Sequence, residues 1–105
     1  MNYRSIKKLQ KIYGANEIQD QINSGLVWKL EGSVGRFATS LLELGICILP
    51  LEDKKDSYGN TVPSRRKLKN GTKGTYQNAV NFWMKVWEGD DETISILEVN
   101  FGNNN

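Results

Sequence analysis

Apolar residues recur at helical spacing near the start of the chain. One side of this segment is apolar: Tyr3, Ile6, Leu9, Ile12 and Tyr13. The other side is basic: Arg4, Lys7, Lys8 and Lys11. The pattern predicts a basic amphipathic helix that ends at Gly14.

A second short helix is expected directly after this glycine. Asn16 is a suitable N-cap, the segment "EIQDQINS" places Ile18 and Ile22 on one side, and Gly25 ends it. Two short helices joined at a glycine resemble a helix-turn-helix, but any helical hairpin gives this pattern. DNA reading by this pair is therefore a minor alternative.

The middle of the chain predicts a helix followed by a strand, after a short segment whose structure the sequence does not decide. "LVWKL", residues 26–30, is apolar enough for a short strand or a buried connection. Ser33 is expected to cap a helix with a wide apolar stripe that stops at Gly45. The β-branched run "ICILPL", residues 46–51, predicts a buried strand whose end, at Pro50, lies near a sheet edge.

The C-terminal third predicts one more helix and one more strand. Apolar and aromatic residues from Tyr76 to Trp87 follow helical spacing after a possible Thr75 cap, so this helix is expected to be buried or to face a partner. The acidic residues 90–92 then form a turn, and Thr93 to Phe101 reads as a strand. We therefore expect an α+β fold, with three to four helices packed on a small sheet, as a single domain over residues 1–102 with a frayed tail at 103–105.

Composition excludes several classes of function. The chain of 105 residues contains no histidine, which rules out a Ser-His-Asp triad and a histidine-containing zinc site, and its single cysteine, Cys47, cannot form an internal disulfide. Within "GICILPL" this cysteine resembles a small core residue. Without a secretory signal or a membrane-spanning run, we expect a cytoplasmic protein that is not an enzyme, binds no membrane and needs no cofactor or metal.

The near-neutral net charge of +2 conceals a strong asymmetry. Residues 54–85 hold eight basic side chains and one acidic one, whereas residues 86–105 hold five acidic side chains and no basic one. Clustered bases favour a phosphate-bearing partner. The alternative is that the acidic C-terminal segment folds back and neutralises them.

Two segments are candidate anion sites. In "EGSVGR" the glycines permit close backbone approach, Ser33 marks a helix start and Arg36 adds a planar donor. The segment does not match a nucleotide-binding glycine motif, so it could equally be a capped helix start whose Arg36 pairs with Glu31 or Glu43.

The second candidate is "GNTVPSRRKLKNGTKGT", residues 59–75. Its turn residues, with Ser64 capping one helical turn from Arg65 to Lys69, predict an ordered loop rather than a flexible linker. Such a loop would present bases beside hydroxyls and amides, and the candidate ligand-binding residues are Arg65, Arg66, Lys69, Lys73, Thr72 and Thr75. A solvated surface loop is the competing interpretation.

Aromatic and acidic residues offer weaker signals. Tyr58, Tyr76 and Trp83 or Trp87 could stack on nucleic-acid bases, although tryptophans at helical spacing usually belong to a core. Only Tyr58 lies in a clearly polar context. Acidic residues 90–92 could hold a divalent cation, but three acids after a glycine more often form a solvated turn.

The order of "WKLEGSVGRFATSLLELGICILP", "YGNTVPSR" and "GTKGT" resembles small uncharacterised proteins of tailed phages and mobile elements. The resemblance covers about half of the chain and carries no known fold or site. It implies a setting in which small proteins bind nucleic acid or neutralise a host protein or signalling molecule. We therefore expect non-enzymatic binding of nucleic acid or a small nucleotide through the loop at 59–75, with Arg36 and Ser33 as outside support; the alternative is a phage-type protein that binds a host protein.

Overall fold

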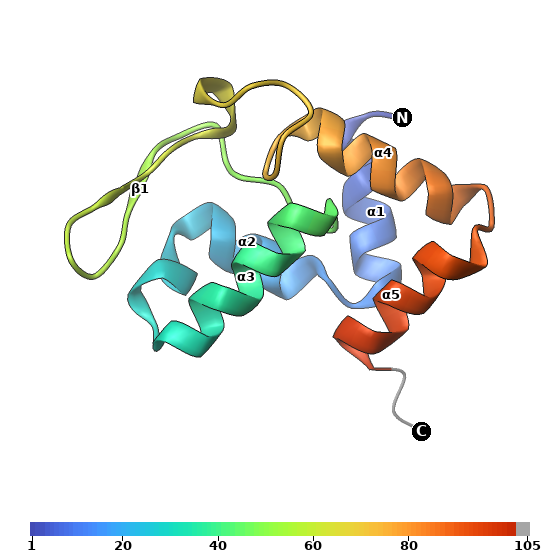
Figure 1. Cartoon of the computed structure of the whole chain (residues 1–105), viewed down its shortest axis with the longest axis horizontal. Coiled ribbons are helices and arrows are strands. Elements are labelled where there is room, and N and C mark those ends of the chain that lie inside the picture. Colours follow the sequence, from blue (N-terminus) through green and yellow to red (C-terminus); the bar gives the residue numbers. More distant parts are fainter. Residues whose placement is uncertain (103–105) are drawn as a thin grey trace.

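The computed structural model describes residues 1–102, and the predicted frayed tail at 103–105 lies outside the described residues. Helices dominate this part of the chain: α1 (Tyr3–Tyr13), α2 (Asn16–Ser24), α3 (Gly32–Leu44), α4 (Tyr76–Trp87) and α5 (Asp91–Phe101). Short 3-10 helices add η1 (Leu26–Lys29) and η2 (Arg65–Lys67). A two-stranded antiparallel hairpin of β1 (Lys54–Lys55) and β2 (Thr61–Val62) projects from one end, as Figure 1 shows.

Four predicted helices are confirmed. The expected caps are confirmed at Thr75, whose side chain accepts an N–H bond of the first turn of α4, and at Gly14, Gly25 and Gly45, which end their helices in the left-handed region. Asn2, which was not predicted, caps α1. At α2 the expected cap is wrong, because Ala15 occupies the cap position and Asn16 lies inside the helix. At α3 the expected cap is wrong, because Glu31 occupies the cap position and Ser33 lies inside the helix.

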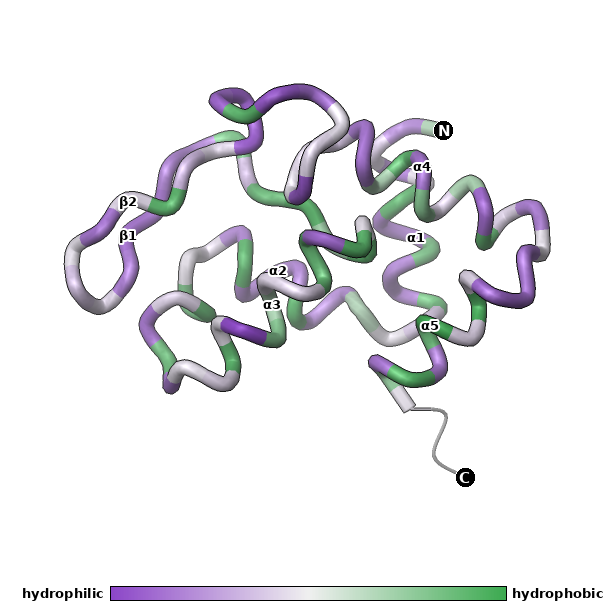
Figure 2. The backbone as a smooth tube through the Cα atoms, in the orientation of Figure 1, coloured by the Kyte–Doolittle hydropathy of each residue, from purple (hydrophilic) through white to green (hydrophobic). Residues whose placement is uncertain are grey.

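The predicted sheet is wrong in both of its strands. The segment 46–50 is fully buried but forms no strand, and in Figure 2 it follows α3 as a hydrophobic stretch through the middle of the molecule. Thr93 to Phe101 is helical, because Asp90 caps α5 by accepting hydrogen bonds from the N–H groups of Glu92 and Thr93. The described residues thus hold five α-helices rather than three or four, and the α+β description applies only loosely.

The buried residues form one hydrophobic cluster. Trp83 of α4 lies at its centre with no exposed surface, and Ile6, Ile22, Leu41 and Ile48 are equally inaccessible. The helices α1, α3 and α5 all contact α4, whereas η1 joins α2 to α3. This packing leaves the hairpin and the loop that follows it on the outside of the core.

Candidate anion-binding site

The segment 52–75 is an ordered loop, as its turn chemistry predicts. Asp56 Oδ1 accepts the N–H groups of Tyr58 at 2.9 Å and Asn60 at 2.8 Å, which closes the hairpin tip. After the hairpin, Asp53 Oδ1 accepts the N–H of Ser64 at 2.8 Å. The helical turn predicted from Arg65 is present as η2, although the Ser64 side chain makes no capping bond.

The two threonines of "GTKGT" support the fold of the loop. Thr75 Oγ accepts N–H bonds from Gly71 at 3.1 Å and Asn78 at 3.3 Å and donates its own hydrogen to the Thr72 carbonyl at 2.6 Å. Thr72 Oγ1 donates to the Lys69 carbonyl at 2.6 Å. Both hydroxyl hydrogens are thus engaged within the protein, so Thr72 and Thr75 position the loop instead of offering a donor to a ligand.

Arg65 turns toward the protein. Its guanidinium donates to the Leu49 carbonyl at 2.7 Å and lies 5.6 Å from the ring centroid of Tyr3. Partial burial lowers the pKa of Arg65 from its ordinary value. The guanidinium remains charged, because an arginine pKa starts far above neutral pH, and it joins the loop to α1.

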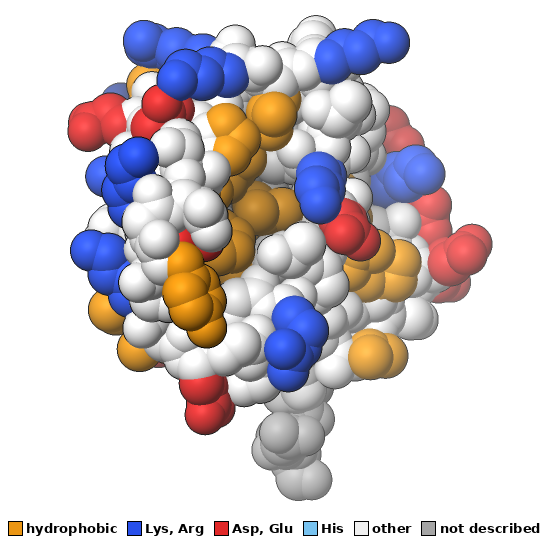
Figure 3. All heavy atoms as spheres, turned by 60° about the vertical axis from the view of Figure 1, so that its left-hand side comes forward, with side chains coloured by type: hydrophobic (Ala, Val, Ile, Leu, Met, Phe, Trp, Pro, Cys, Tyr) orange, Lys and Arg blue, Asp and Glu red, His pale blue; other side chains and the backbone are white. Residues whose placement is uncertain are grey.

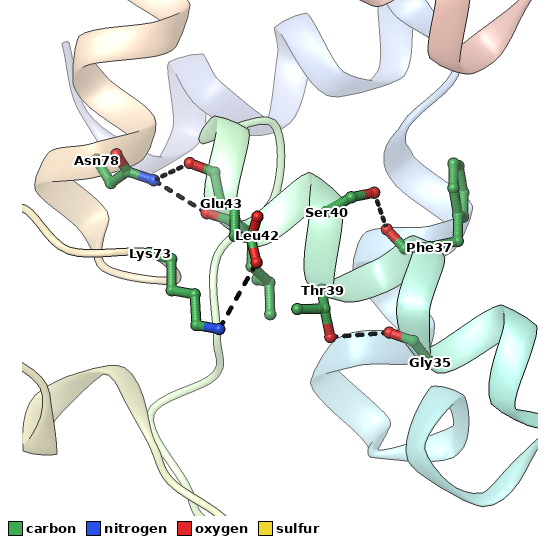
Figure 4. Close-up of polar contacts among 8 residues, drawn as sticks. All are labelled: Gly35, Phe37, Thr39, Ser40, Leu42, Glu43, Lys73 and Asn78. Atoms are coloured by element: carbon green, nitrogen blue, oxygen red, sulfur yellow. Dashed lines mark hydrogen bonds and ion pairs between the residues drawn. The ribbon is translucent and has the colours of Figure 1, made fainter.

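The other bases of the loop face solvent. Lys67 pairs with Asp53, and this hydrogen bond, followed by the one from the Ser64 N–H, holds the pKa of Asp53 below its ordinary value. Lys73 Nζ lies 3.7 Å from Glu43 Oε1, a contact between exposed groups that Figure 4 shows. Arg66 and Lys69 are exposed, and neither forms an ion pair within residues 1–102.

The contact between Arg65 and Tyr3 extends the basic loop onto α1. Lys7 Nζ lies 5.8 Å from the centroid of the same tyrosine ring. A surface hollow of about 470 Å³ runs along this side of α1, where Asp20 of α2 is its acidic lining residue. We call the combined area the α1–η2 surface, and its bases are Arg4, Lys7, Lys8, Lys11 and Arg65. We add Arg66, the exposed residue that follows Arg65 in η2.

Sequence reasoning identified both halves of this surface but did not join them. The basic side of the first helix and the basic loop are about 60 residues apart, and only the tertiary contact through Tyr3 brings them together. Tyr3 is half-buried against the core, and its place in the apolar stripe of the first helix gave no signal for that contact.

The remaining predicted residues lie elsewhere. Arg36 and Tyr58 line one hollow between α3 and the hairpin, and Tyr58 is 88% exposed at the hairpin tip. Ser33 Oγ donates to Glu31 Oε1 at 3.0 Å. Arg36 forms no ion pair with Glu31 or Glu43 in the described part of the chain. These three residues are therefore separate from the α1–η2 surface.

The acidic C-terminal segment does not pair with the basic loop in the described structure. The ion pairs found within residues 1–102 use Asp53 and Glu43, and Asp90 is occupied as the cap of α5. No group of three or more side chains suited to a metal ion occurs in this described range, and no helix there has the length and apolar character to cross a membrane.

The aromatic helix α4 is mainly core. Trp83 is buried and its indole N–H donates to the Ile46 carbonyl at 3.1 Å, whereas Trp87 is 71% exposed. Tyr76 donates its hydroxyl hydrogen to the Met1 carbonyl at 2.6 Å. Of the aromatic residues considered for base stacking, only Tyr58 and Trp87 present open rings.

Comparison of this chain with protein-family models, with curated proteins and with solved structures found no match.

Proposed function

We propose that the protein is a non-enzymatic binding protein for phosphate-bearing ligands, and that nucleic acid is the ligand class that fits its surface best. The observation that carries the proposal is the contact of Arg65 with the Tyr3 ring, which joins η2 of the loop to the basic side of α1. Bases from two elements then form one extended positive area rather than a closed pocket. Such an area suits a phosphate backbone, because each neutralised phosphate releases counterions.

The exposed lysines and arginines favour a polymer over a small nucleotide. Arg4, Lys8 and Arg66 are exposed, as are Lys7 and Lys11, so they offer several separate phosphate contacts. A single mononucleotide would use only a few of them. The sequence lacks histidine, the commonest general acid or base of enzymes.

The experiment is a fluorescence anisotropy titration of labelled single-stranded and double-stranded DNA and RNA at several salt concentrations. The logarithm of the binding constant should fall linearly with the logarithm of the salt concentration. For duplex DNA we expect a slope of about −0.9 for each phosphate contacted. Lys8→Ala with Arg66→Ala should weaken binding and reduce this slope.

A matched double variant controls for net charge. Lys29→Ala with Lys85→Ala removes two exposed positive charges outside the α1–η2 surface and should leave the slope nearly unchanged. Equal losses in the two double variants, or no binding to any of the four polymers, would refute the proposal.

Binding of a host protein is the second candidate, and the exposure of Trp87 favours it. This ring is 71% exposed at the end of α4, and exposed tryptophans are common anchors of interfaces. Trp87→Ala should abolish capture of a protein partner without changing nucleic-acid affinity, which separates the two candidates.

A further inference from the structure

A groove separates α3 from the hairpin. Its outer hollow, of about 520 Å³, is lined by Arg36 and Tyr58 among others, and its inner hollow, of about 260 Å³, reaches Leu42 and Leu68. Trp28 and Thr39 line both hollows, which makes them parts of one groove. Figure 3 shows hydrophobic side chains at the bottom of a depression on this side of the molecule.

The inner hollow has apolar walls and one positively charged side chain. Its hydrophobic walls come from η1, α3, the buried segment after α3, β2 and the loop that follows: Trp28, Leu42, Leu49, Val62, Pro63 and Leu68. Lys73 is the charged residue of this lining, and no acidic residue belongs to it. The Glu43 carboxylate lies 3.7 Å from Lys73 Nζ, and both side chains are more than half exposed. An exposed pair of this kind contributes little stability, so an incoming anion can replace Glu43.

Two hydrogen-bonding features accompany these walls. Thr39 Oγ1 donates to the Gly35 carbonyl at 2.9 Å, which leaves its oxygen able to accept (Figure 4). Trp28 Nε1 is buried and has no acceptor within the described residues. Native proteins keep few such groups, because a buried donor without a partner costs free energy. Because no hydrogen bond from residues 1–102 fixes the Trp28 indole, this wall is suited to shift when the groove fills.

We propose that this groove binds a small molecule with a flat hydrophobic body and a single anionic head group, a carboxylate or a phosphate. The body lies along Trp28, Leu42 and Val62, and the head group lies at Lys73. The ligand lies in the inner hollow, whose volume of about 260 Å³ is just below the usual range of ligand pockets and suits a small ligand. A few polar groups among apolar walls are typical of such sites. This site is distinct from the α1–η2 surface and does not depend on the nucleic-acid proposal.

The test is a two-dimensional 1H–15N NMR titration of the whole protein that follows the assigned indole N–H signal of Trp28. The probes are 2-naphthoate, 2-naphthyl phosphate and the neutral 2-naphthalenemethanol. The two anions should cause saturable shifts of the Trp28 signal, and the alcohol should bind roughly tenfold more weakly, the factor expected for loss of one charge-assisted contact. The ratio of the two anion affinities distinguishes a carboxylate site from a phosphate site.

Two variants of one loop supply the control. Lys73→Gln should weaken 2-naphthoate binding roughly tenfold, whereas Lys69→Gln removes an exposed lysine that does not line the groove and should leave the affinity unchanged. The proposal is overturned if the Trp28 signal does not move at about millimolar probe, if the alcohol binds as tightly as the anions, or if the two variants behave alike. Nucleic-acid affinity should be the same in Lys73→Gln as in Lys69→Gln if the two sites are independent.

Discussion

Gln10 of α1 and Gln19 of α2 are joined inside the core, where Gln10 Nε2 donates to Gln19 Oε1 at 2.9 Å. Both side chains are 1% exposed. Gln19 also bonds both backbone groups of Ile48: it donates to the carbonyl at 2.8 Å and accepts from the N–H at 2.9 Å. The amide side chain thus takes the place of a neighbouring β-strand for this residue.

Removal of Gln19 should therefore be strongly destabilising. Gln19→Ala leaves the N–H and carbonyl of Ile48 without partners in the core, and at 1 to 3 kcal/mol for each such group we expect a loss of about 3 kcal/mol. Urea unfolding measures this loss. Gln77→Ala is the control, because Gln77 makes an exposed bond to Asn81 on α4 and should cost under about 0.5 kcal/mol. Similar losses for both variants would contradict the structural role of Gln19.

The same contact explains why the sequence predicted a strand at residues 46–51. The apolar run correctly indicates burial, and its backbone groups do need partners. Gln10, Gln19 and the indole of Trp83 supply those of Ile46 and Ile48, and the N–H groups of Cys47 and Leu49 donate to backbone carbonyls outside any strand. A single sequence does not reveal such long-range side-chain partners. In α5 the error has a local cause: β-branched residues favoured a strand, whereas Asp90 and the acids of the first turn favour a helix start.

Only a small part of the candidate site was predicted as a ligand site. Of the ligand-binding residues expected from the sequence, Arg65 and Arg66 were assigned to the α1–η2 surface. The others lie elsewhere or support the loop: Lys69, Lys73, Thr72, Thr75, Arg36, Ser33 and Tyr58. Helix α1, with its basic side, and the order of the 59–75 loop both follow from local signals. The inward turn of Arg65 onto Tyr3 and Leu49 does not, because it depends on how α1 and the segment after α3 pack together. That packing determines why Arg65 is half-buried whereas its neighbour Arg66 is exposed.

Gly45 should be intolerant of any side chain. Its φ of +96° is unfavourable for other residues, and an added Cβ would lie 2.6 Å from the Asn78 carbonyl oxygen and 2.9 Å from Phe82 Cβ. Asn78 Nδ2 also donates to the Leu42 and Glu43 carbonyls there (Figure 4), so α4 cannot easily move away.

A second glycine isolates the clash from the backbone strain. Gly14 has a φ of +86°, and no atom of the described residues beyond its chain neighbours lies within 4 Å of an added Cβ. Gly14→Ala should therefore cost only the left-handed penalty of about 1–2 kcal/mol. Gly45→Ala should cost about 2 kcal/mol more, since it also overpacks a core contact. Equal unfolding midpoints for the two variants would show that α3 and α4 are not in close contact.

Cys47 should make the protein less stable at high pH. Burial raises the pKa of its thiol from 9.0 to about 12. Below pH 9 the thiol is protonated in both states and stability is unaffected by it. Between pH 9 and 12 the unfolded chain loses a proton that the folded chain keeps, so the free energy of unfolding falls by about 1.4 kcal/mol per pH unit.

Urea unfolding at pH 8 and pH 10 measures this effect against Cys47→Ala. The variant lacks the thiol and should lose about 1 kcal/mol less than the wild type over this interval, even though the shorter side chain lowers its stability at both pH values. Parallel pH dependences would contradict burial of the thiol.

Adjacent arginines of η2 should have different roles. Arg65→Ala removes the hydrogen bond to the Leu49 carbonyl and the contact with Tyr3. We therefore expect the free energy of unfolding, measured in urea, to fall by about 1–2 kcal/mol.

Arg66 is exposed and pairs with no acid in the described residues. Arg66→Ala should therefore change the free energy of unfolding by under about 0.5 kcal/mol. Arg66→Ala should instead weaken nucleic-acid binding and reduce the salt slope by the amount of about one phosphate contact. If Arg65→Ala is as stable as the wild type, the guanidinium does not fasten the loop to α1, and the continuity of the α1–η2 surface is lost with it.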